Sequence, residues 1–594
     1  MPRRRTVVAA AAAVATAVTV PGAAAATVPG PAAAGAASDE AVTGVVARVE
    51  GGLIRGERTG GLSVFRGVPY AAPPVGALRY RSPRPVVPWS GVRDATAFAP
   101  VSYQSYLPGS SEDSLYANVW TPHTGGSGPG HPGRPVVVYI HGGGWFLGAG
   151  SEPDFDGARP ATHGDMVVIT FNYRLGALGW GLHEDLVDER TGGYSNWGLQ
   201  DQVALLHWVR RNAAAFGGDP ENITLVGTSA GGSSTWQLGL LPELRGTVRR
   251  IVPISVKHVW EPASSMSRED SHRVFELVAR KLGTSVRGLR AVPADRLKET
   301  WEKIFSGSPT DREISTWREY QGPVVDDRWM LGHDFELPTP DLPTLAVYGR
   351  TEGTFFTTGP GYPFPGPHPT DDASLRTAVR AVLHKGAVHV ADTEVDAAIS
   401  AYRRAAAIDG LPQDPVSIWG AIWGDSLFRY QITRLAERQA RERPEVPSYL
   451  MEFAHPVAPP LTGTPHEATS KFLFGTYGSA VNAPHYGDGP LERLVSDTFI
   501  DLIASFARGR APSSPNAPAV PRFSPDRPST LILGGERVAE IGERSALRGL
   551  AHWDTAGWVP VPRPATVPAA TTVPEPATDP KPTTVPAPAT APGP

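Results

Sequence analysis

The segment Phe216–Gly232 constrains the fold more than any other part of the chain. It contains a Gly- and Pro-rich turn, a short β-branched run at Ile223–Val226, and a Gly-x-Ser-x-Gly motif centred on Ser229. A stretch long enough for a helix follows. A sharp strand-to-helix turn of this kind lifts the serine hydroxyl clear of a sheet, and the flanking glycines let the backbone pass. The N–H groups that open the helix point toward any negative charge that develops at the serine.

Buried strands are predicted on both sides of this segment. The continuous apolar runs Pro135–Ile140 and Met166–Phe171 are typical of strands covered on both faces of a parallel sheet. Asn196–Phe216 has helical periodicity. Strand and helix alternating in this order indicate an α/β fold with a mostly parallel central sheet flanked by helices. Further strands are predicted at Ile251–Ser255, Thr344–Tyr348 and Ser448–Phe453.

Large helical insertions are expected between the later strands. A charged, mostly helical insertion is predicted over about 267–314. Amphipathic surface helices are predicted at Leu375–Leu383, Glu394–Ile408 and Ser426–Glu442.

The two ends of the chain differ in composition from the region between them. Arg3-Arg4-Arg5, an apolar Ala/Val run and small residues at Ala23–Ala26 have the form of a signal peptide, of the Sec or twin-arginine type. We predict a signal peptide at 1–26, a disordered linker at 27–40, one α/β domain at 41–558 and a disordered Pro/Thr-rich tail at 559–594. The alternative for the N-terminus is a disordered Ala-rich leader. We expect a secreted protein with no transmembrane segment.

Composition and motifs exclude several classes of function. The net charge is only −4, which does not suggest a nucleic-acid partner. The 594 residues include no cysteine, so disulfides and thiolate metal sites are excluded. No nucleotide-binding or metal-binding motif is present. We therefore expect no metal and no cofactor.

A serine nucleophile needs a base, a group that orients the base, and donors for the oxyanion. Gly142-Gly143-Gly144 directly follows a predicted buried strand. The N–H groups of Gly143, Gly144 and Ala230 are the predicted oxyanion donors, because glycine lets the backbone approach a substrate closely. The alternative is a plain glycine turn.

An ordered set of motifs resembles the type-B carboxylesterases, an α/β-hydrolase family that includes cholinesterases, bacterial para-nitrobenzyl esterases and the non-catalytic neuroligins. The resemblance covers about residues 41–540. It is carried by Phe65–Pro74, Glu112–Trp120, His141–Gly148, Asn172–Gly179, Asn196–Gly232 and Pro323–Asp326.

The resemblance implies a catalytic triad of Ser229, Glu352 and His466. Glu352 stands in a Glu-Gly-x-x-Phe context, and His466 precedes Phe474-Gly475. The order Ser, Glu, His along the chain is the one that this fold uses. Asp326 is a rival for the acid, and His455 and His485 are rivals for the base. Trp145 and Phe146 either line the acyl side of a pocket or only pack.

The chain departs from the family pattern near the predicted triad. Thr228 replaces the glutamate that usually precedes the nucleophile, and Thr469 replaces a common acid. Ser114 stands where many relatives have a disulfide cysteine. Ser255 matches a serine that supports the catalytic acid. We expect the buried acidic network, and with it the pH optimum, to differ from that of relatives.

The expected function is that of a secreted serine carboxylesterase acting on a small-molecule or lipid-like ester. One alternative is a catalytically silent binding or adhesion homologue. Another is a lipase- or amidase-type hydrolase with the same triad.

Overall fold

The computed structural model describes residues 43–122, 133–256, 266–305, 322–358, 368–383, 391–459, 462–527, 529–543 and 546–555. The predicted signal peptide, linker and Pro/Thr-rich tail lie outside these residues. Part of the predicted helical insertion, from 306 onward, also lies outside them.

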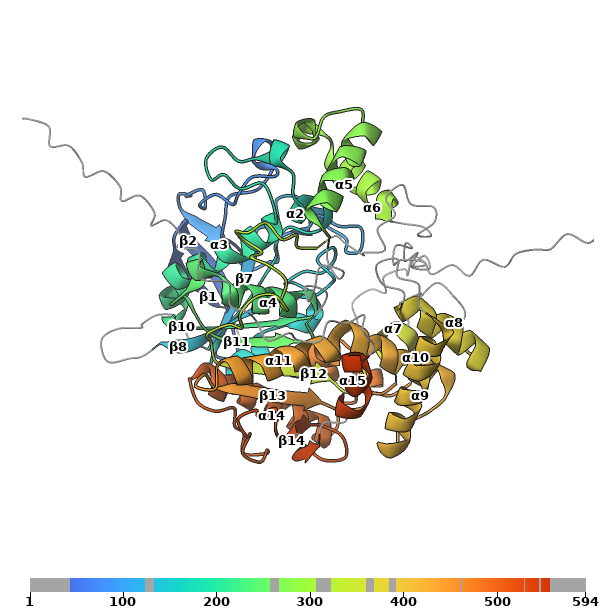
Figure 1. Cartoon of the computed structure of the whole chain (residues 1–594). Coiled ribbons are helices and arrows are strands. Elements are labelled where there is room, and N and C mark those ends of the chain that lie inside the picture. The colour runs from blue at the N-terminus through green and yellow to red at the C-terminus, as the bar shows by residue number, and fades with distance from the viewer. Residues whose placement is uncertain are drawn as a thin grey trace, which may run out of the picture. The chain divides into compact units, whose positions relative to one another are not determined.

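A large mixed sheet organises the described residues (Figure 1). Its strand order is β1-β2-β3-β7-β9-β8-β10-β11-β12-β13-β14-β15, and β4 pairs with β2. The strands from β9 through β8 to β14 are parallel to one another, and β7 and β15 pair antiparallel at the two ends of this block. The predicted fold class is confirmed. The strands are β1 (Thr43–Val49), β2 (Gly52–Thr59), β3 (Leu62–Pro69), β4 (Val92–Asp94), β7 (Tyr116–Thr121), β8 (Arg134–Ile140), β9 (Val167–Phe171), β10 (Gly218–Thr228), β11 (Val248–Ile254), β12 (Thr344–Gly349), β13 (Ser448–Phe453), β14 (Ser529–Leu533) and β15 (Ala539–Glu543); β5 (Val101–Ser102) and β6 (Ser110–Ser111) form a separate small sheet.

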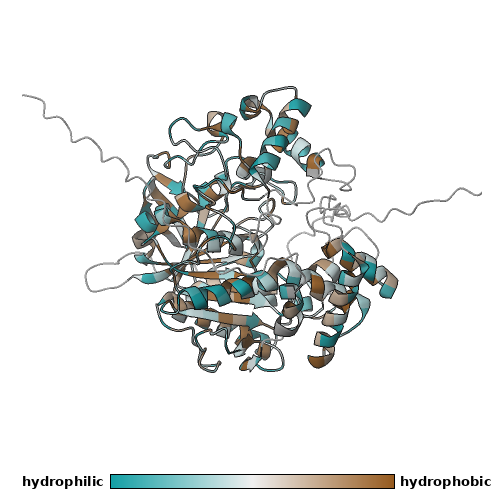
Figure 2. Ribbon diagram, in the orientation of Figure 1, coloured by the Kyte–Doolittle hydropathy of each residue, from teal (hydrophilic) through white to brown (hydrophobic). Residues whose placement is uncertain are grey.

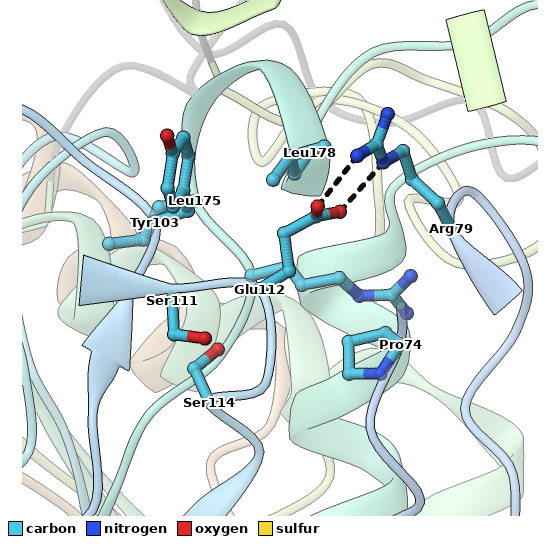
Figure 3. A pocket seen from close by; sticks show the side chains of 9 residues that line it. Pro74, Arg79, Tyr103, Ser111, Glu112, Ser114, Leu175 and Leu178 are labelled. Carbon is cyan, nitrogen blue, oxygen red and sulfur yellow. Dashed lines mark hydrogen bonds and ion pairs between the residues drawn. The ribbon is translucent and has the colours of Figure 1, made fainter. Parts of the chain in front are cut away.

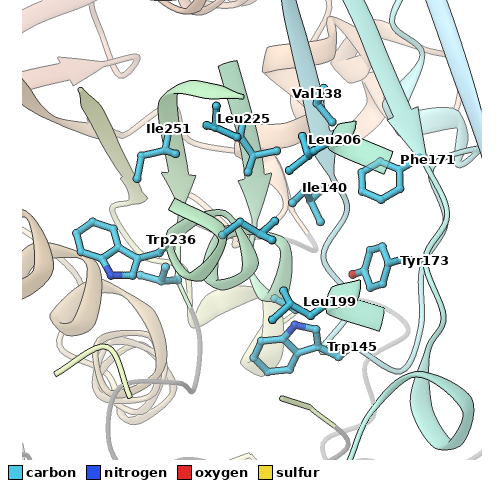
Figure 4. Close-up of a cluster of buried hydrophobic side chains, with 14 of the residues drawn as sticks. Val138, Ile140, Trp145, Phe171, Tyr173, Leu199, Leu206, Leu225, Trp236 and Ile251 are labelled. Carbon is cyan, nitrogen blue, oxygen red and sulfur yellow. The ribbon is translucent and has the colours of Figure 1, made fainter. Parts of the chain in front are cut away.

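Helices cover both faces of the sheet, which explains the continuous apolar strands. Successive residues of β8 enter different core clusters: Val138 and Ile140 lie in one, and Val137 and Tyr139 lie in the other. The first cluster is closed by α3 (Trp197–Asn212), α4 (Ala230–Leu240) and α11 (Tyr430–Glu442); Figure 4 shows part of it. The second is closed by α1 (Ala158–Gly164), α12 (Ala468–Phe474) and α14 (Pro490–Ala507).

Two groups of helices are inserted between strands, as predicted. The first, α5 (Arg268–Lys281) and α6 (Ala294–Phe305), follows β11 and packs with α2 (Gly176–Gly179) and the start of α3 in a third apolar cluster. The second lies between β12 and β13, and the two groups are distinct in Figure 1. The second group consists of α7 (Thr354–Thr358), α8 (Asp372–Leu383), α9 (Asp392–Ile408), α10 (Pro415–Gly424) and α11. The remaining α-helices are α13 (Ala483–Tyr486) and α15 (Ala546–Thr555).

The prediction of a surface helix at Ser426–Glu442 is wrong. Every residue from Tyr430 to Gln439 of α11 is buried. The polar residues that suggested a solvated face are instead hydrogen-bonded inside the protein: Arg434 Nη1 donates to Glu437 Oε2 at 2.6 Å, and Arg438 Nη1 donates to the Asp334 carbonyl at 2.9 Å. Sequence periodicity does not distinguish a paired buried arginine from an exposed one.

A buried ion pair joins two segments that precede β7, and its arginine also contacts the first insertion. Arg79 makes two parallel bonds to Glu112, Nε to Oε2 at 2.7 Å and Nη2 to Oε1 at 2.6 Å (Figure 3). Arg79 Nη1 also donates to the Leu289 carbonyl at 3.0 Å. A small cavity beside the pair is lined by Tyr103 and Ser114, among others.

Ser114, which stands at the family's disulfide position, accepts a hydrogen bond from Ser102 Oγ at 3.1 Å.

The hydropathy of the described helices fits this arrangement. The peripheral helices alternate between polar and apolar residues (Figure 2). None of the helices in the described ranges is long and apolar enough to cross a membrane.

Candidate active site

The predicted strand–serine–helix turn is present at Ser229. β10 ends at Thr228 and α4 begins at Ala230, while Ser229 itself has φ 60° and ψ −124°, a strained conformation for a side chain with a Cβ. Its N–H donates to the Ile254 carbonyl at 2.9 Å. A Cβ added to Gly231 would lie 2.1 Å from the Ile140 carbonyl oxygen. The glycine of the motif is therefore required by the close approach of β8.

The glycine loop after β8 lies against the serine. A Cβ added to Gly142 would lie 3.0 Å from the Ser229 Cβ. Gly143 and Gly144 have φ of +95° and +60°, and their N–H groups make no hydrogen bond to any residue that the structure describes. Ala230 is the first residue of α4, so its N–H has no acceptor within the helix. The N–H groups of the two glycines therefore have no partner among the described residues, and that of Ala230 has none within its helix.

Glu352 and His466 form a direct, buried hydrogen bond. Glu352 follows β12 and is 2% exposed; His466 precedes α12 and is 7% exposed. Glu352 Oε2 lies 2.6 Å from His466 Nδ1. A carboxylate only accepts, so Nδ1 carries a proton, and in the neutral form of the imidazole Nε2 has the lone pair. Nε2 is buried, and among the described residues it has no hydrogen-bond partner.

The second oxygen of Glu352 is held by two donors. Oε1 accepts a bond from Ser255 Oγ at 2.8 Å and one from the Gly349 N–H at 2.7 Å. These bonds fix the rotation of the carboxylate, so that Oε2 faces the imidazole.

Neutral hydroxyl groups surround the Ser229 turn, and one of them belongs to Thr228, which stands where the family pattern has a glutamate. Ser470 Oγ donates to Thr228 Oγ1 at 3.2 Å and lies 2.9 Å from Tyr139 OH. Ser470 is on α12, four residues after His466. This chain of hydroxyls therefore joins the Ser229 turn to the helix that follows His466 without adding a charge.

A model of the carboxylesterase family matches residues 40–544. The chain belongs to the carboxylesterase family. It is 33% identical over 517 residues to the phenmedipham hydrolase of Pseudarthrobacter oxydans, covering 83% of this chain and 96% of that protein. It is 43% identical over 223 residues to the para-nitrobenzyl esterase of Bacillus subtilis, covering 36% of this chain and 43% of that protein.

Solved structures agree with this assignment. A carboxylesterase of Geobacillus stearothermophilus is similar with a TM-score of 0.70 and 29% identity, covering 86% of this chain and 99% of that one. A PNB esterase is similar with a TM-score of 0.67 and 28% identity, covering 84% and 97%. The protein is thus a carboxylic ester hydrolase of the type-B carboxylesterase group with the α/β-hydrolase fold.

The rival acid in this carboxylesterase has a structural task. Asp326 Oδ1 accepts bonds from the N–H groups of Trp329 at 2.8 Å and Met330 at 3.0 Å. Its Oδ2 accepts bonds from Ser195 Oγ and from Asn196 Nδ2. Asp326 therefore ties its own loop to the start of α3.

The rival bases do not contact Glu352. His455 Nε2 lies 3.2 Å from Glu492 Oε1, and burial lowers the pKa of His455. His485 lies on α13, away from the acid loop in the chain, and its carbonyl accepts a bond from the Ala458 N–H. His466 is the histidine that the carboxylesterase fold brings to Glu352.

Trp145 packs inside the protein. Its side chain is 2% exposed, and its ring meets that of Trp180 edge-on at 6.1 Å. Figure 4 places it at the lower edge of the core cluster. Phe146 is half-buried, with its ring 5.6 Å from that of Tyr106.

His141, at the start of the glycine loop, is a packing residue of the carboxylesterase. Its ring stacks on Tyr173 at 4.4 Å, and Nδ1 lies 2.9 Å from the Gly142 carbonyl. Burial lowers the pKa of His141 to about 4, so the ring is neutral near pH 7.

Sequence reasoning missed two supports of the site. The Gly349 N–H bond to Glu352 is a backbone contact without a side-chain signature. The contact of Tyr139 with Ser470 joins residues 331 positions apart, which no local pattern encodes. No cluster of His, Cys, Asp and Glu that could hold a metal occurs in the part of the chain that the structure describes.

Proposed function

We propose that the protein is a secreted serine carboxylesterase that hydrolyses carboxylic esters through an acyl-enzyme on Ser229, with His466 as base and Glu352 as orienting acid. The observation that carries this proposal is the buried Glu352–His466 bond of 2.6 Å, with the opposite imidazole nitrogen unpartnered among the described residues. That nitrogen has the lone pair that a serine hydroxyl needs.

In the acylation step, His466 Nε2 takes the proton of Ser229 as its oxygen attacks the ester carbonyl. The N–H groups of Gly143, Gly144 and Ala230 bind the oxyanion; each such donor typically contributes about 10²–10³-fold in rate. Glu352 stabilises the imidazolium. His466 then protonates the departing alcohol, and water activated by His466 releases the acid from Ser229.

A fluorophosphonate probe tests the nucleophile directly. We expect stoichiometric labelling of the folded protein and none of the Ser229→Ala variant, while the Ser233→Ala variant, with an altered neighbouring serine on α4, should still be labelled. If the folded wild type takes up no probe, the catalytically silent homologue is the correct interpretation.

Initial rates measured across a panel of substrates would identify the substrate class. The panel contains p-nitrophenyl esters of increasing acyl length beside the matching anilide. Phenmedipham and fumonisin B1 belong in it, because relatives named for them are 33% identical to this chain over 517 and 325 residues. We expect short esters to react fastest. An anilide that reacts as fast as the ester would favour an amidase, and a rate that rises steeply with chain length would favour a lipase.

Secretion is a proposal that depends on residues 1–26. The Arg3-Arg4-Arg5 cluster and the apolar run that follows support it. Expression of the full chain in a secreting host should yield a mature protein whose N-terminus lies near residue 27, and Edman sequencing of extracellular protein measures it. Retention of the intact chain inside the cell would contradict export.

A further inference from the structure

A single π-helical turn separates α10 from α11. The turn is Asp425–Arg429, and the Tyr430 N–H bonds to the Asp425 carbonyl five residues earlier. Such a turn inserts one residue into a helix and rotates the side chains that follow it; π turns often occur at functional sites. The four residues Asp425, Ser426, Phe428 and Arg429 of this turn are buried.

Phe428, on this turn, stacks on the imidazole of His466. The two ring centroids lie 4.0 Å apart, with 25° between the ring planes. Phe356 and Phe355 also approach the imidazole, but at 5.7 and 6.3 Å and with tilts of 40° and 46°. Phe428 is fully buried and is the closest of the three. The Phe428 ring therefore covers one face of the imidazole, while Glu352 accepts a hydrogen bond from Nδ1 at its edge.

This contact changes in strength during the proposed reaction. The imidazole is neutral when it receives the serine proton and is a cation in the transition state. A cation over the face of an aromatic ring is attracted by the ring quadrupole, and the attraction is larger when water is excluded. An interaction that is stronger in the transition state than in the ground state accelerates the chemical step.

The π turn is tied to the loop that carries Glu352. Asp425 and Arg429 pair through Nε–Oδ1 at 2.5 Å and Nη2–Oδ2 at 2.8 Å. Arg429 Nη1 donates to the Arg350 carbonyl at 2.8 Å, two residues before the acid. A Cβ on Gly424 would lie 2.5 Å from the Gly353 nitrogen. The π turn that carries Phe428 and the loop that carries Glu352 are thus directly connected, so the positions of the two side chains around the imidazole are linked.

The charged groups around His466 come from three elements. Glu352 contacts it from the acid loop, and Glu467 follows it in the chain, where burial raises the pKa of that carboxyl. The Asp425–Arg429 ion pair lies on the same turn as Phe428. Ring substitutions at position 428 leave all of these charges in place.

We propose that Phe428 is a positioning residue that stabilises the charged form of His466 during acyl transfer, and that the π turn sets its ring on the imidazole. The inference rests on the proposed triad, because it assigns Phe428 an effect on the base of that triad. It does not require Phe428 to touch the substrate.

Stepwise fluorination of the ring tests the proposal, since fluorine weakens the quadrupole with little change in size. Phenylalanine at position 428 is replaced by its 4-fluoro, 3,5-difluoro and 3,4,5-trifluoro forms by nonsense suppression. We expect kcat for a p-nitrophenyl ester to fall progressively, by about threefold to tenfold over the series, with KM nearly unchanged. The acidic limb of the kcat/KM–pH profile should move to lower pH, because the imidazolium becomes less stable.

The same series at Phe453 is the control. Phe453 is equally buried, lies on β13, and stacks with Phe499 at 5.9 Å. Fluorination there should leave kcat and the pH profile unchanged. Phe428→Leu should lower kcat by at least as much as the trifluoro ring, and Phe428→Tyr should retain most of it.

Two results would overturn the proposal: a kcat that stays constant across the series at position 428, or an equal fall at Phe453. Failure of the proposed function itself is visible separately. In that case the unsubstituted protein hydrolyses no ester and takes up no fluorophosphonate.

Discussion

At the scale of single residues, the two oxygens of Glu352 have different tasks. Oε1 is held by Ser255 and by a backbone N–H, and Oε2 holds His466. An amide at this position keeps the size of the side chain but presents a donor to one of these partners. Replacing Glu352 by glutamine therefore tests how the imidazole is oriented as well as the effect of the carboxylate charge.

We expect Glu352→Gln to reduce kcat by about 10²–10⁴-fold with a small change in KM, because the imidazole loses its tautomeric control. Steady-state hydrolysis of a p-nitrophenyl ester measures it. Asp326→Asn is the matched control for the rival acid: it should lower thermal stability, since Asp326 accepts several bonds, yet leave kcat per folded molecule within about twofold. The reverse pattern would assign the acid to Asp326.

Substitutions at Thr228 test whether the absence of charge beside Ser229 affects the pH dependence of the reaction. Thr228→Glu places a carboxylate beside Ser229 and near the hydroxyl chain to Ser470. A negative charge there favours the protonated imidazole, so the acidic limb of the kcat/KM–pH profile should move upward by about one pH unit. Thr228→Gln has nearly the same shape without the charge, and its profile should match the wild type. Identical profiles for the two variants would show that position 228 has no electrostatic influence on the base.

At the scale of secondary-structure elements, a buried ion pair joins two segments before β7, and its arginine also contacts the first insertion. The Arg79 side chain is 7% exposed and that of Glu112 is 15% exposed, so the pair is largely desolvated. Arg79 also donates to the Leu289 carbonyl, just before α6. Because a buried cation without its anion is costly, the pair holds the two segments more firmly than an exposed pair would.

Glu112→Gln should lower the free energy of unfolding by about 3 kcal/mol, because Arg79 keeps its charge and loses the carboxylate. Glu189→Gln is the matched control: its carboxylate pairs with Arg81 at 2.6 Å but is 73% exposed. That substitution should lower the free energy of unfolding far less than Glu112→Gln does, because the exposed charges stay solvated. Urea unfolding followed by tryptophan fluorescence compares the two, and equal losses would mean that burial of the pair contributes nothing.

At the scale of the whole molecule, buried histidines link stability to pH. The ordinary pKa of histidine is near 6.5, whereas burial lowers that of His141 to about 4. Between these values the unfolded chain binds a proton that the folded protein does not. The stabilisation is therefore complete above pH 6.5 and is lost as the pH falls toward 4.

His141→Gln should remove this contribution. Between pH 7 and pH 5 the wild type is expected to lose about 2 kcal/mol more stability than the variant does. Urea unfolding at both pH values measures the difference. His207→Gln, which alters a half-buried histidine on α3, is the control and should behave like the wild type. Parallel losses in wild type and His141→Gln would show that His141 does not titrate differently in the folded state.

The sequence determined those features that depend on a few consecutive residues. The Ser229 turn and the Gly142–Gly144 loop were predictable because close backbone approach excludes a Cβ there. The parallel strands were predictable because burial on both faces requires continuous apolar runs. The proposed acid and base, Glu352 and His466, came from the family resemblance, which selected them among many carboxylates and histidines.

Only the tertiary structure decided how these parts are supported. The Tyr139–Ser470 contact and the Gly349 bond to Glu352 depend on how strands and helices meet, not on local pattern. The sequence pattern predicts a solvated face for α11, which is wrong because its arginines are paired inside the protein, Arg434 with Glu437 and Arg438 with the distant Asp334 carbonyl. The stacking of Phe428 on His466 depends on one extra residue in a helical turn. An extra residue in one turn rotates the side chains that follow it, but it leaves the local composition that of an ordinary α-helix. The sequence pattern therefore does not reveal the π turn.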